Sequence, residues 1–177
     1  MFEHDTLKVV CKNKANDIER YDNQLFPGDA GGGLREFMQQ WIKRADAIVI
    51  GYYHQDSLQG YGVVTICKQL PEKIIYRISP LYANTGEIAQ SILTGLIALV
   101  SKNYFCHIEL NTLATSETEF GRFLKDTGFI ENGKNFVVCN KPHLISKEAT
   151  ILQHIFCSIP LEYPHEVIAG STLELDD

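Results

Sequence analysis

The sequence lacks the cysteine and histidine spacings that hold metal ions. It contains no CxxC pair and no HExxH motif, and its six histidines are scattered along the chain. We therefore expect no metal site. The odd number of widely separated cysteines, mostly in apolar segments, indicates buried, reduced thiols rather than a disulfide framework. These cysteines are Cys11, Cys67, Cys106, Cys139 and Cys157.

The sequence also lacks long runs of basic residues and long apolar runs. No stretch gathers five or more lysines or arginines, and the formal net charge is −6, so a nucleic-acid partner is not expected. The longest apolar run, ILTGLIALV, is far shorter than the roughly 20 residues that cross a membrane. The first residues, MFEHDTLKVV, contain no apolar core of signal-peptide length. We expect a cytoplasmic protein without a membrane partner.

The composition that remains is that of an ordinary globular protein. With 177 residues, 45% of them hydrophobic and 21% charged, residues 1–177 are expected to form a single domain. Weak alternation predicts a first strand in TLKVVCK, followed by an irregular stretch from NKAND through YDNQLFPGDAGGGL. Apolar spacing then predicts an amphipathic helix over Leu34–Ala45.

Strand-like runs dominate the middle of the chain. AIVIGYYH, YGVVTIC and KIIYRIS are rich in β-branched and aromatic residues, and their short connectors QDSLQG and KQLPE favour an antiparallel meander. Helical spacing over Glu87–Ser101 and a strand at YFCHIEL predict a parallel pair joined by a right-handed crossover.

The last third of the chain gives weaker patterns. A short helix is predicted over Thr118–Thr127, ended by Gly128, with a strand at NFVVCN after it. Beyond Pro142, LISKEATILQHIFCSIPL fits a short helix or a loop, and EVIAGSTLEL fits a closing strand.

Three segments carry a family resemblance: GYGVV at 60–64, YRISPLYANTGEIAQSIL at 76–93, and FLKDTGF, which ends at Phe129. Together they resemble the GNAT superfamily of N-acetyltransferases. ERYDNQLFPGD and STLEL are similar to segments of a narrower group, the C-terminal domains of YitH-like two-domain acetyltransferases. The resemblance spans about Ile18 to Leu175. It implies an α/β (α+β) fold with a mixed, mostly antiparallel sheet, a splayed parallel strand pair and flanking helices.

The resemblance also implies acetyl-CoA as the cofactor. In this family the pantetheine arm lies between the splayed strands, and the pyrophosphate meets the first N–H groups of the following helix. Glu87 stands where the usual loop has a glycine, so its carboxylate would repel a pyrophosphate, and Gly86, one position earlier, partly restores the room. The alternative is that Glu87 is an ordinary first-turn acid that stabilises the empty helix through its dipole. The implied cofactor-binding residues are Ile78, Ser79, Pro80, Leu81, Asn84, Thr85, Gly86, Glu87, Ile88 and Ala89.

Catalytic residues follow from the same resemblance and from strand periodicity. Many GNAT enzymes have a tyrosine acid four residues before the glycine of the late helix, but that position is Leu124, so Tyr82 in the proline-led loop is the candidate acid. The alternative is that the Tyr82 ring has a packing role. His107 and Glu109 share one face of their strand with Phe105 and are candidate bases that act through a water. The alternative is that both line a solvent-facing side of the strand.

Candidates for acceptor binding are more dispersed. Tyr76 and Arg77 lie on the strand before the cofactor loop. Asp22, together with Asp29, is expected to capture a cationic amine, and the alternative is simple loop capping.

Two functions are compatible with these features. The first is an acetyl-CoA-dependent N-acetyltransferase acting on a small-molecule or protein amine. The second is a catalytically silent GNAT-like module that binds a ligand or a protein. The resemblance places a better cofactor motif in a first domain that is absent here, which favours a degenerate module or a homodimer in which a second copy replaces that domain. An open groove beside Pro80 would favour the enzyme, and a filled groove the module.

Overall fold

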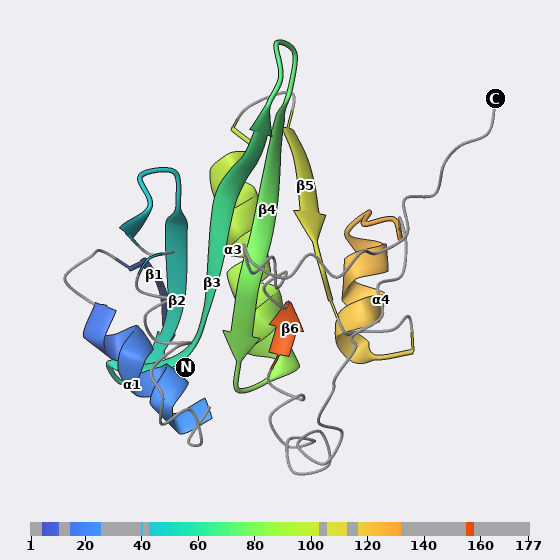
Figure 1. Ribbon diagram of the computed structural model, residues 1–177. Helices are drawn as coiled ribbons and strands as arrows, with labels where there is room; N and C mark the ends of the chain where they lie inside the picture. The colour runs from blue at the N-terminus through green and yellow to red at the C-terminus, as the bar shows by residue number, and fades with distance from the viewer. Residues whose placement is uncertain are drawn as a thin grey trace, which may run out of the picture.

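The computed structural model describes residues 5–10, 15–25, 40, 43–102, 106–112, 117–131 and 155–157. A mixed sheet forms its frame (Figure 1). Adjacent strands are antiparallel from the first to the fourth, whereas the fifth is parallel to the fourth. In spatial order they are β1 (Asp5–Val9), β2 (Ile48–His54), β3 (Ser57–Gln69), β4 (Ile74–Ala83) and β5 (Cys106–Leu110). A short strand, β6 (Ile155–Cys157), pairs with β4 off this path. The predicted fold class, meander and parallel pair are confirmed.

Helices cover both faces of the sheet (Figure 1). In that view α1 (Ala15–Leu25) lies in front of the sheet and α3 (Gly86–Val100) behind it, with α4 (Glu119–Asp126) beside β5. Each covered face has its own core. The core beneath α3 includes Ile50, Val64, Tyr76, Ile78, Ile92, Leu96 and Leu124, and the core beneath α1 includes Ile18, Tyr21, Val49, Tyr53, Tyr61, Val63 and Tyr82.

Helix α3 forms where its apolar spacing predicts. Thr85 is the N-cap residue, and its Oγ1 accepts a hydrogen bond from the Ile88 N–H at 3.3 Å. Gly62 allows the helix to pack closely, because a Cβ on this residue would lie 2.8 Å from Ile92 Cγ2. Helix α4 ends as predicted, with Gly128 at a φ of +90° just beyond it.

Helix α1 was not predicted, since its residues fall in the stretch expected to be irregular. Its buried side chains are Ile18, Tyr21, Asp22 and Leu25, at helical spacings of three, one and three. A carboxylate interrupts the apolar stripe at Asp22, which weakens the pattern in the sequence.

Two predicted boundaries also move. The turn before β3 contains only Gln55 and Asp56, both with positive φ, and Ser57–Gly60 belongs to the strand. Strand β4 continues through Pro80 to Ala83, so the expected proline-led loop is wrong and Tyr82 lies on a strand. Pro80 follows the last residue of β4 that pairs with β5 and sits at an irregularity in the pairing with β3, where a residue without an N–H is tolerated.

Other predictions are wrong or lie outside the described residues. Ile155–Cys157 is a strand rather than part of a helix or loop. Cys67 is an exposed free thiol, not a buried one, because β3 extends beyond the end of its pairing with β2. Outside the described residues are Asp29, Phe105, the glycine run, NFVVCN, EVIAGSTLEL and most of the helix predicted over Leu34–Ala45.

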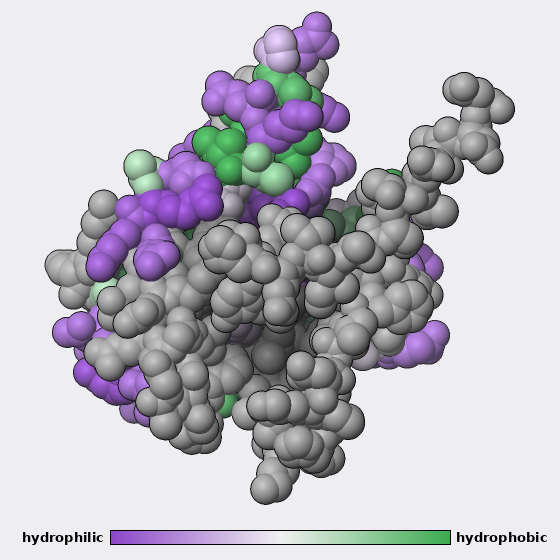
Figure 2. Space-filling view, viewed as in Figure 1, coloured by the Kyte–Doolittle hydropathy of each residue, from purple (hydrophilic) through white to green (hydrophobic). Residues whose placement is uncertain are grey.

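The surface shows the same extension of β3 and β4. Figure 2 shows hydrophobic residues exposed among hydrophilic ones over this hairpin end of the sheet. Within the described part of the chain, no helix is long and apolar enough to cross a membrane.

Candidate active site

The pairing of β4 with β5 ends halfway along β4. Their parallel pairing runs from Ile74↔Cys106 to Ile78↔Leu110, but β4 continues to Ala83. Its pairing with β6 then begins at Leu81↔Cys157 and includes Tyr82↔Ile155. Ser79 and Pro80 lie between the two pairings. The parallel pair therefore separates after Ile78, where β5 ends at Leu110, and β6 pairs with the same edge of β4 beyond Pro80.

The divergent end of β4 leads directly into the N-terminus of α3. The Ile88 and Ala89 N–H groups donate to Thr85, whereas no hydrogen-bond acceptor is recorded among the described residues for those of Gly86 and Glu87. Among the described residues, no atom lies within 4 Å of a Cβ built on Gly86, so the position beside this residue is open. Free N–H groups at the positive end of a helix dipole attract an anion.

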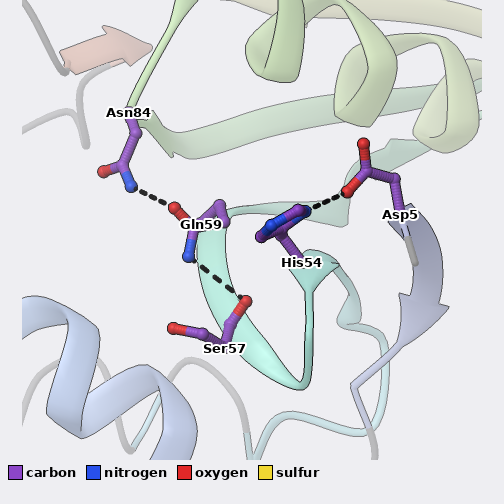
Figure 3. Close-up of polar contacts among 5 residues, drawn as sticks. All are labelled: Asp5, His54, Ser57, Gln59 and Asn84. Atoms are coloured by element: carbon purple, nitrogen blue, oxygen red, sulfur yellow. Dashed lines mark hydrogen bonds and ion pairs between the residues drawn. The ribbon is translucent and has the colours of Figure 1, made fainter. Parts of the chain in front are cut away.

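An acidic side chain lies in the first turn of α3. Glu87 is exposed in the first turn of α3. Burial, then the Asp5 carboxylate, then the charge of Glu87 raise the pKa of Tyr52 on β2. Asp5 Oδ1 also lies 2.6 Å from His54 Nδ1 (Figure 3). Glu87 therefore sits close enough to β2 to influence its groups, and its charge opposes an anion at the helix end.

The residue before the N-cap, Asn84, is held from two sides. Its backbone N–H donates to the Gln59 carbonyl at 3.0 Å, and its Nδ2 donates to Gln59 Oε1 at 2.8 Å (Figure 3). Its Oδ1 accepts a hydrogen bond from the Tyr21 hydroxyl at 3.1 Å. The end of β4 is thus linked to both β3 and α1.

A carboxyl group is buried beneath α1. Asp22 is 7% exposed, and the Tyr61 hydroxyl donates to its two oxygens at 2.9 and 3.2 Å. Among the described residues Tyr61 is its sole recorded hydrogen-bond donor. Burial raises the pKa of Asp22 to about 7, against a smaller lowering by the Tyr61 hydrogen bond. The group is therefore divided between its neutral and charged forms near pH 7.

Aromatic rings surround this carboxyl group. Tyr61 packs edge-on against Tyr21, with ring centroids 6.0 Å apart, and edge-on against Tyr82 at 5.6 Å. The cluster of Tyr21, Asp22, Tyr61 and Tyr82, here called the tyrosine cluster, joins α1, β3 and the divergent end of β4.

A second charged group lies on β4 and β5. Arg77 Nη2 is 3.5 Å from Glu109 Oε2, and His107 Nε2 is 3.8 Å from Glu109 Oε1. The neighbours of these residues on each strand belong to the core beneath α3, so the three side chains lie on the sheet face that α1 covers. His107 is exposed, and Glu109 is 43% exposed. The face therefore carries a partly solvated carboxylate as well as the buried one.

A family model described as acetyltransferase (GNAT) domain matches residues 18–150. The chain belongs to the GNAT acetyltransferase family. The predicted N-acetyltransferase class is confirmed at this level, and acetyl-CoA is the acetyl donor of the family. No match was found among curated proteins. The comparisons do not show the narrower YitH-like resemblance, which stays a prediction.

Solved structures with this fold include several acetyltransferases. One is aminoglycoside acetyltransferase meta-AAC0020 from an uncultured soil metagenomic sample, with 14% identity, a TM-score of 0.57, and coverage of 77% of this chain and 97% of that one. Another is ribosomal-protein-alanine N-acetyltransferase from Brucella melitensis biovar Abortus 2308, with 12% identity, a TM-score of 0.56, and coverage of 76% and 97%. A third is AAC(6')-Iy with a CoA-containing bisubstrate analogue, with 9% identity, a TM-score of 0.56, and coverage of 78% and 99%. These likenesses show the fold.

Within this GNAT fold, the predicted site residues separate into groups. The predicted cofactor residues follow one another along the divergent end of β4 and the start of α3. Arg77 and His107 both lie close to the Glu109 carboxylate. Asp22 and Tyr82 both contact Tyr61, and Tyr82 is 4% exposed. Tyr76 lies in the core beneath α3, on the opposite face from Asp22, and Leu124 is buried in that same core.

Sequence reasoning missed Tyr21, Tyr61 and Gln59. The spacing of Ile18, Tyr21, Asp22 and Leu25 is a usable helix pattern and could have identified Tyr21 as a buried neighbour of Asp22. Tyr61 and Gln59 gave no comparable local pattern, because their contacts join residues 39 and 25 positions apart.

Proposed function

We propose that this protein transfers the acetyl group of acetyl-CoA to an amine that binds on the α1 face of the sheet. One observation carries the proposal: β4 leaves β5 after Ile78 and runs directly into a capped helix, and the position beside its first residue, Gly86, is open among the described residues. That arrangement provides a place for a pantetheine arm beside a strand and for phosphate at the helix N-terminus.

The coenzyme site consists mainly of backbone. The N–H groups of Gly86 and Glu87 would hold the pyrophosphate, and β4 near Ser79 would hold the thioester end. The open space beside Gly86 supports this fit, since a side chain there would occupy the phosphate position. The Glu87 carboxylate opposes it, so we expect weaker coenzyme binding than a glycine at this position would allow.

The acceptor is an amine that carries positive charge before it reacts. Asp22 supports this choice, because it is a buried carboxyl group with a single recorded donor among the described residues, and a carboxylate accepts several hydrogen bonds. Aminoglycosides and N-terminal alanine amines, named for two of the structural relatives, are therefore suitable first acceptors to test.

The proton chemistry falls to side chains on the same face. Acetyl-CoA supplies an activated thioester when bound. Glu109 is the proposed base, which takes the amine proton through a water, and Arg77 and His107 hold its carboxylate in place. Tyr82, on the divergent end of β4, is the proposed acid for the departing thiolate.

The competing function is a silent GNAT-like module. Strand β6 occupies the β4 edge at Leu81 and Tyr82, which is the part of the groove that a module would fill. The pairing of β4 with β5 ends at Ile78, and that with β6 begins at Leu81.

The test is an acetyl-transfer assay with a matched pair of variants. Acetyl-CoA is incubated with an aminoglycoside, a linear diamine or an N-terminal alanine peptide, and released thiol is compared with acetylated product by mass. We expect equal amounts of both with at least one amine. Glu109→Gln should lower kcat at least tenfold, whereas Glu72→Gln, in the exposed hairpin turn, should stay within twofold. Coenzyme binding without any acetylated amine would favour the silent module.

A further inference from the structure

A line of hydrogen bonds connects α1 to the loop that precedes α3. The Tyr21 hydroxyl donates to Asn84 Oδ1 at 3.1 Å, and Asn84 Nδ2 donates to Gln59 Oε1 at 2.8 Å. Figure 3 shows the Asn84 amide directed at Gln59 at the start of β3. The oxygen and the nitrogen of the Asn84 amide therefore both take part in hydrogen bonds, which fixes the orientation of this group.

The Tyr21 end of this line is rigid. Its ring packs edge-on against Tyr61 on β3, and the residue is 5% exposed. Burial, and then the charge of Asp22, raises the pKa of Tyr21, so its hydroxyl stays a donor at physiological pH. A buried hydroxyl of fixed direction sets the position of an otherwise exposed asparagine.

Asn84 immediately precedes the N-cap residue Thr85 and lies two residues before Gly86. A shift of Asn84 therefore moves the backbone that carries the Gly86 and Glu87 N–H groups. Tyr21 adjoins Asp22 in sequence, so one turn of α1 both contacts this loop through Tyr21 and carries the carboxyl group proposed for the acceptor.

We propose that Tyr21, acting through Asn84, is a positioning residue for the coenzyme loop, and that it links coenzyme binding to the helix that faces the acceptor. The inference rests on the proposed function, because it requires coenzyme A at the start of α3. Linkage is reciprocal, so an acceptor that moves α1 changes the affinity for coenzyme A by the same factor by which coenzyme A changes the affinity for that acceptor.

The experiment compares two tyrosine-to-phenylalanine variants. Tyr21→Phe keeps the ring and removes the hydroxyl that reaches Asn84. Tyr53→Phe is the matched control, since the Tyr53 hydroxyl also bonds to α1, at Asp17 Oδ2 over 3.2 Å, but does not reach the coenzyme loop. We expect calorimetric titration with coenzyme A to show about fivefold weaker binding for Tyr21→Phe, the loss of one neutral hydrogen bond, and a change within twofold for Tyr53→Phe.

A double variant tests the route through Asn84. In an Asn84→Ala background, adding Tyr21→Phe should cause no further loss of coenzyme affinity, because the shared bond is already absent. Equal effects of Tyr21→Phe and Tyr53→Phe, or a full additional loss in the Asn84→Ala background, would overturn the inference while leaving the proposed function intact. A wild-type protein that binds no coenzyme A would instead overturn the proposed function.

Discussion

The burial and the pKa of Asp22 depend on its position in the fold. On an exposed loop it would be an ordinary carboxylate, as the capping alternative assumed. On α1 it is 7% exposed and hydrogen-bonded to a buried tyrosine, and burial raises its pKa to about 7. The residue could be selected from the sequence as a candidate for amine binding, but its burial depends on a helix that the sequence pattern concealed.

The raised pKa of Asp22 makes stability depend on pH. The folded state favours the neutral carboxyl group, whose usual pKa is 3.8, so this stabilisation is complete below about pH 4 and is lost as pH rises through about 7. Asp22→Asn keeps a neutral side chain at every pH. We expect the free energy of unfolding of the wild type to fall more between pH 5 and 8 than that of Asp22→Asn, measured by urea denaturation. Asp17→Asn, on the same helix, is the control. An equal fall in the free energy of unfolding with pH for the wild type and Asp22→Asn would refute the raised pKa of Asp22.

Gly86 allows stability to be separated from coenzyme binding. Alanine is the better helix former, so Gly86→Ala should stabilise the protein by about 0.5 kcal/mol. Its methyl group enters the space next to the first N–H groups, and we expect several-fold weaker coenzyme A binding by calorimetry. Gly95→Ala, in the same helix but in contact with Ile50, should leave coenzyme affinity unchanged. If Gly86→Ala binds coenzyme A as tightly as the wild type, the phosphate lies elsewhere.

Among the elements, α3 could be predicted because its apolar residues follow helical spacing. The β2–β4 meander could be predicted because its strands are rich in β-branched and aromatic residues and their connectors are short. Helix α1 and the end of β4 could not. Asp22 breaks the apolar stripe of α1, and Pro80 suggests the end of a strand, although proline is tolerated where a strand irregularity needs no N–H donor. The tyrosine cluster joins three elements, so no local pattern reveals it.

The electrostatics of α3 give a prediction at the level of the element. Glu87→Gln removes an acid from the first turn, which should cost about 0.5 kcal/mol of stability through the helix dipole. The same change removes a repulsive charge from the phosphate position, so coenzyme A should bind about threefold more tightly at low salt, and less so at high salt. Glu119→Gln, in the first turn of α4, should lose similar stability without any gain in affinity. A gain of affinity in both variants, or in neither, would contradict the placement of Glu87 beside the phosphate.

At the scale of the whole molecule, connected elements of the fold carry the Asp22 carboxyl group, the Glu109 carboxyl group and the N-terminus of α3. The family resemblance in the sequence correctly indicated a GNAT fold, and the divergence of β4 from β5 bears out its expected geometry. The homodimer stays a prediction. What the sequence could not provide were the contacts between distant residues, such as Tyr21 with Asn84 and Tyr61 with Asp22, which decide how the two halves of the candidate site are held together.

The most direct test of a coenzyme site at the junction of β4 and α3 is an amide chemical-shift titration of the ¹⁵N-labelled protein with coenzyme A. We expect saturable shifts that are largest at the N–H groups of Gly86 and Glu87 and extend to Asn84. Saturable shifts confined to other elements, or no shifts at millimolar coenzyme A, would contradict a coenzyme site at this junction.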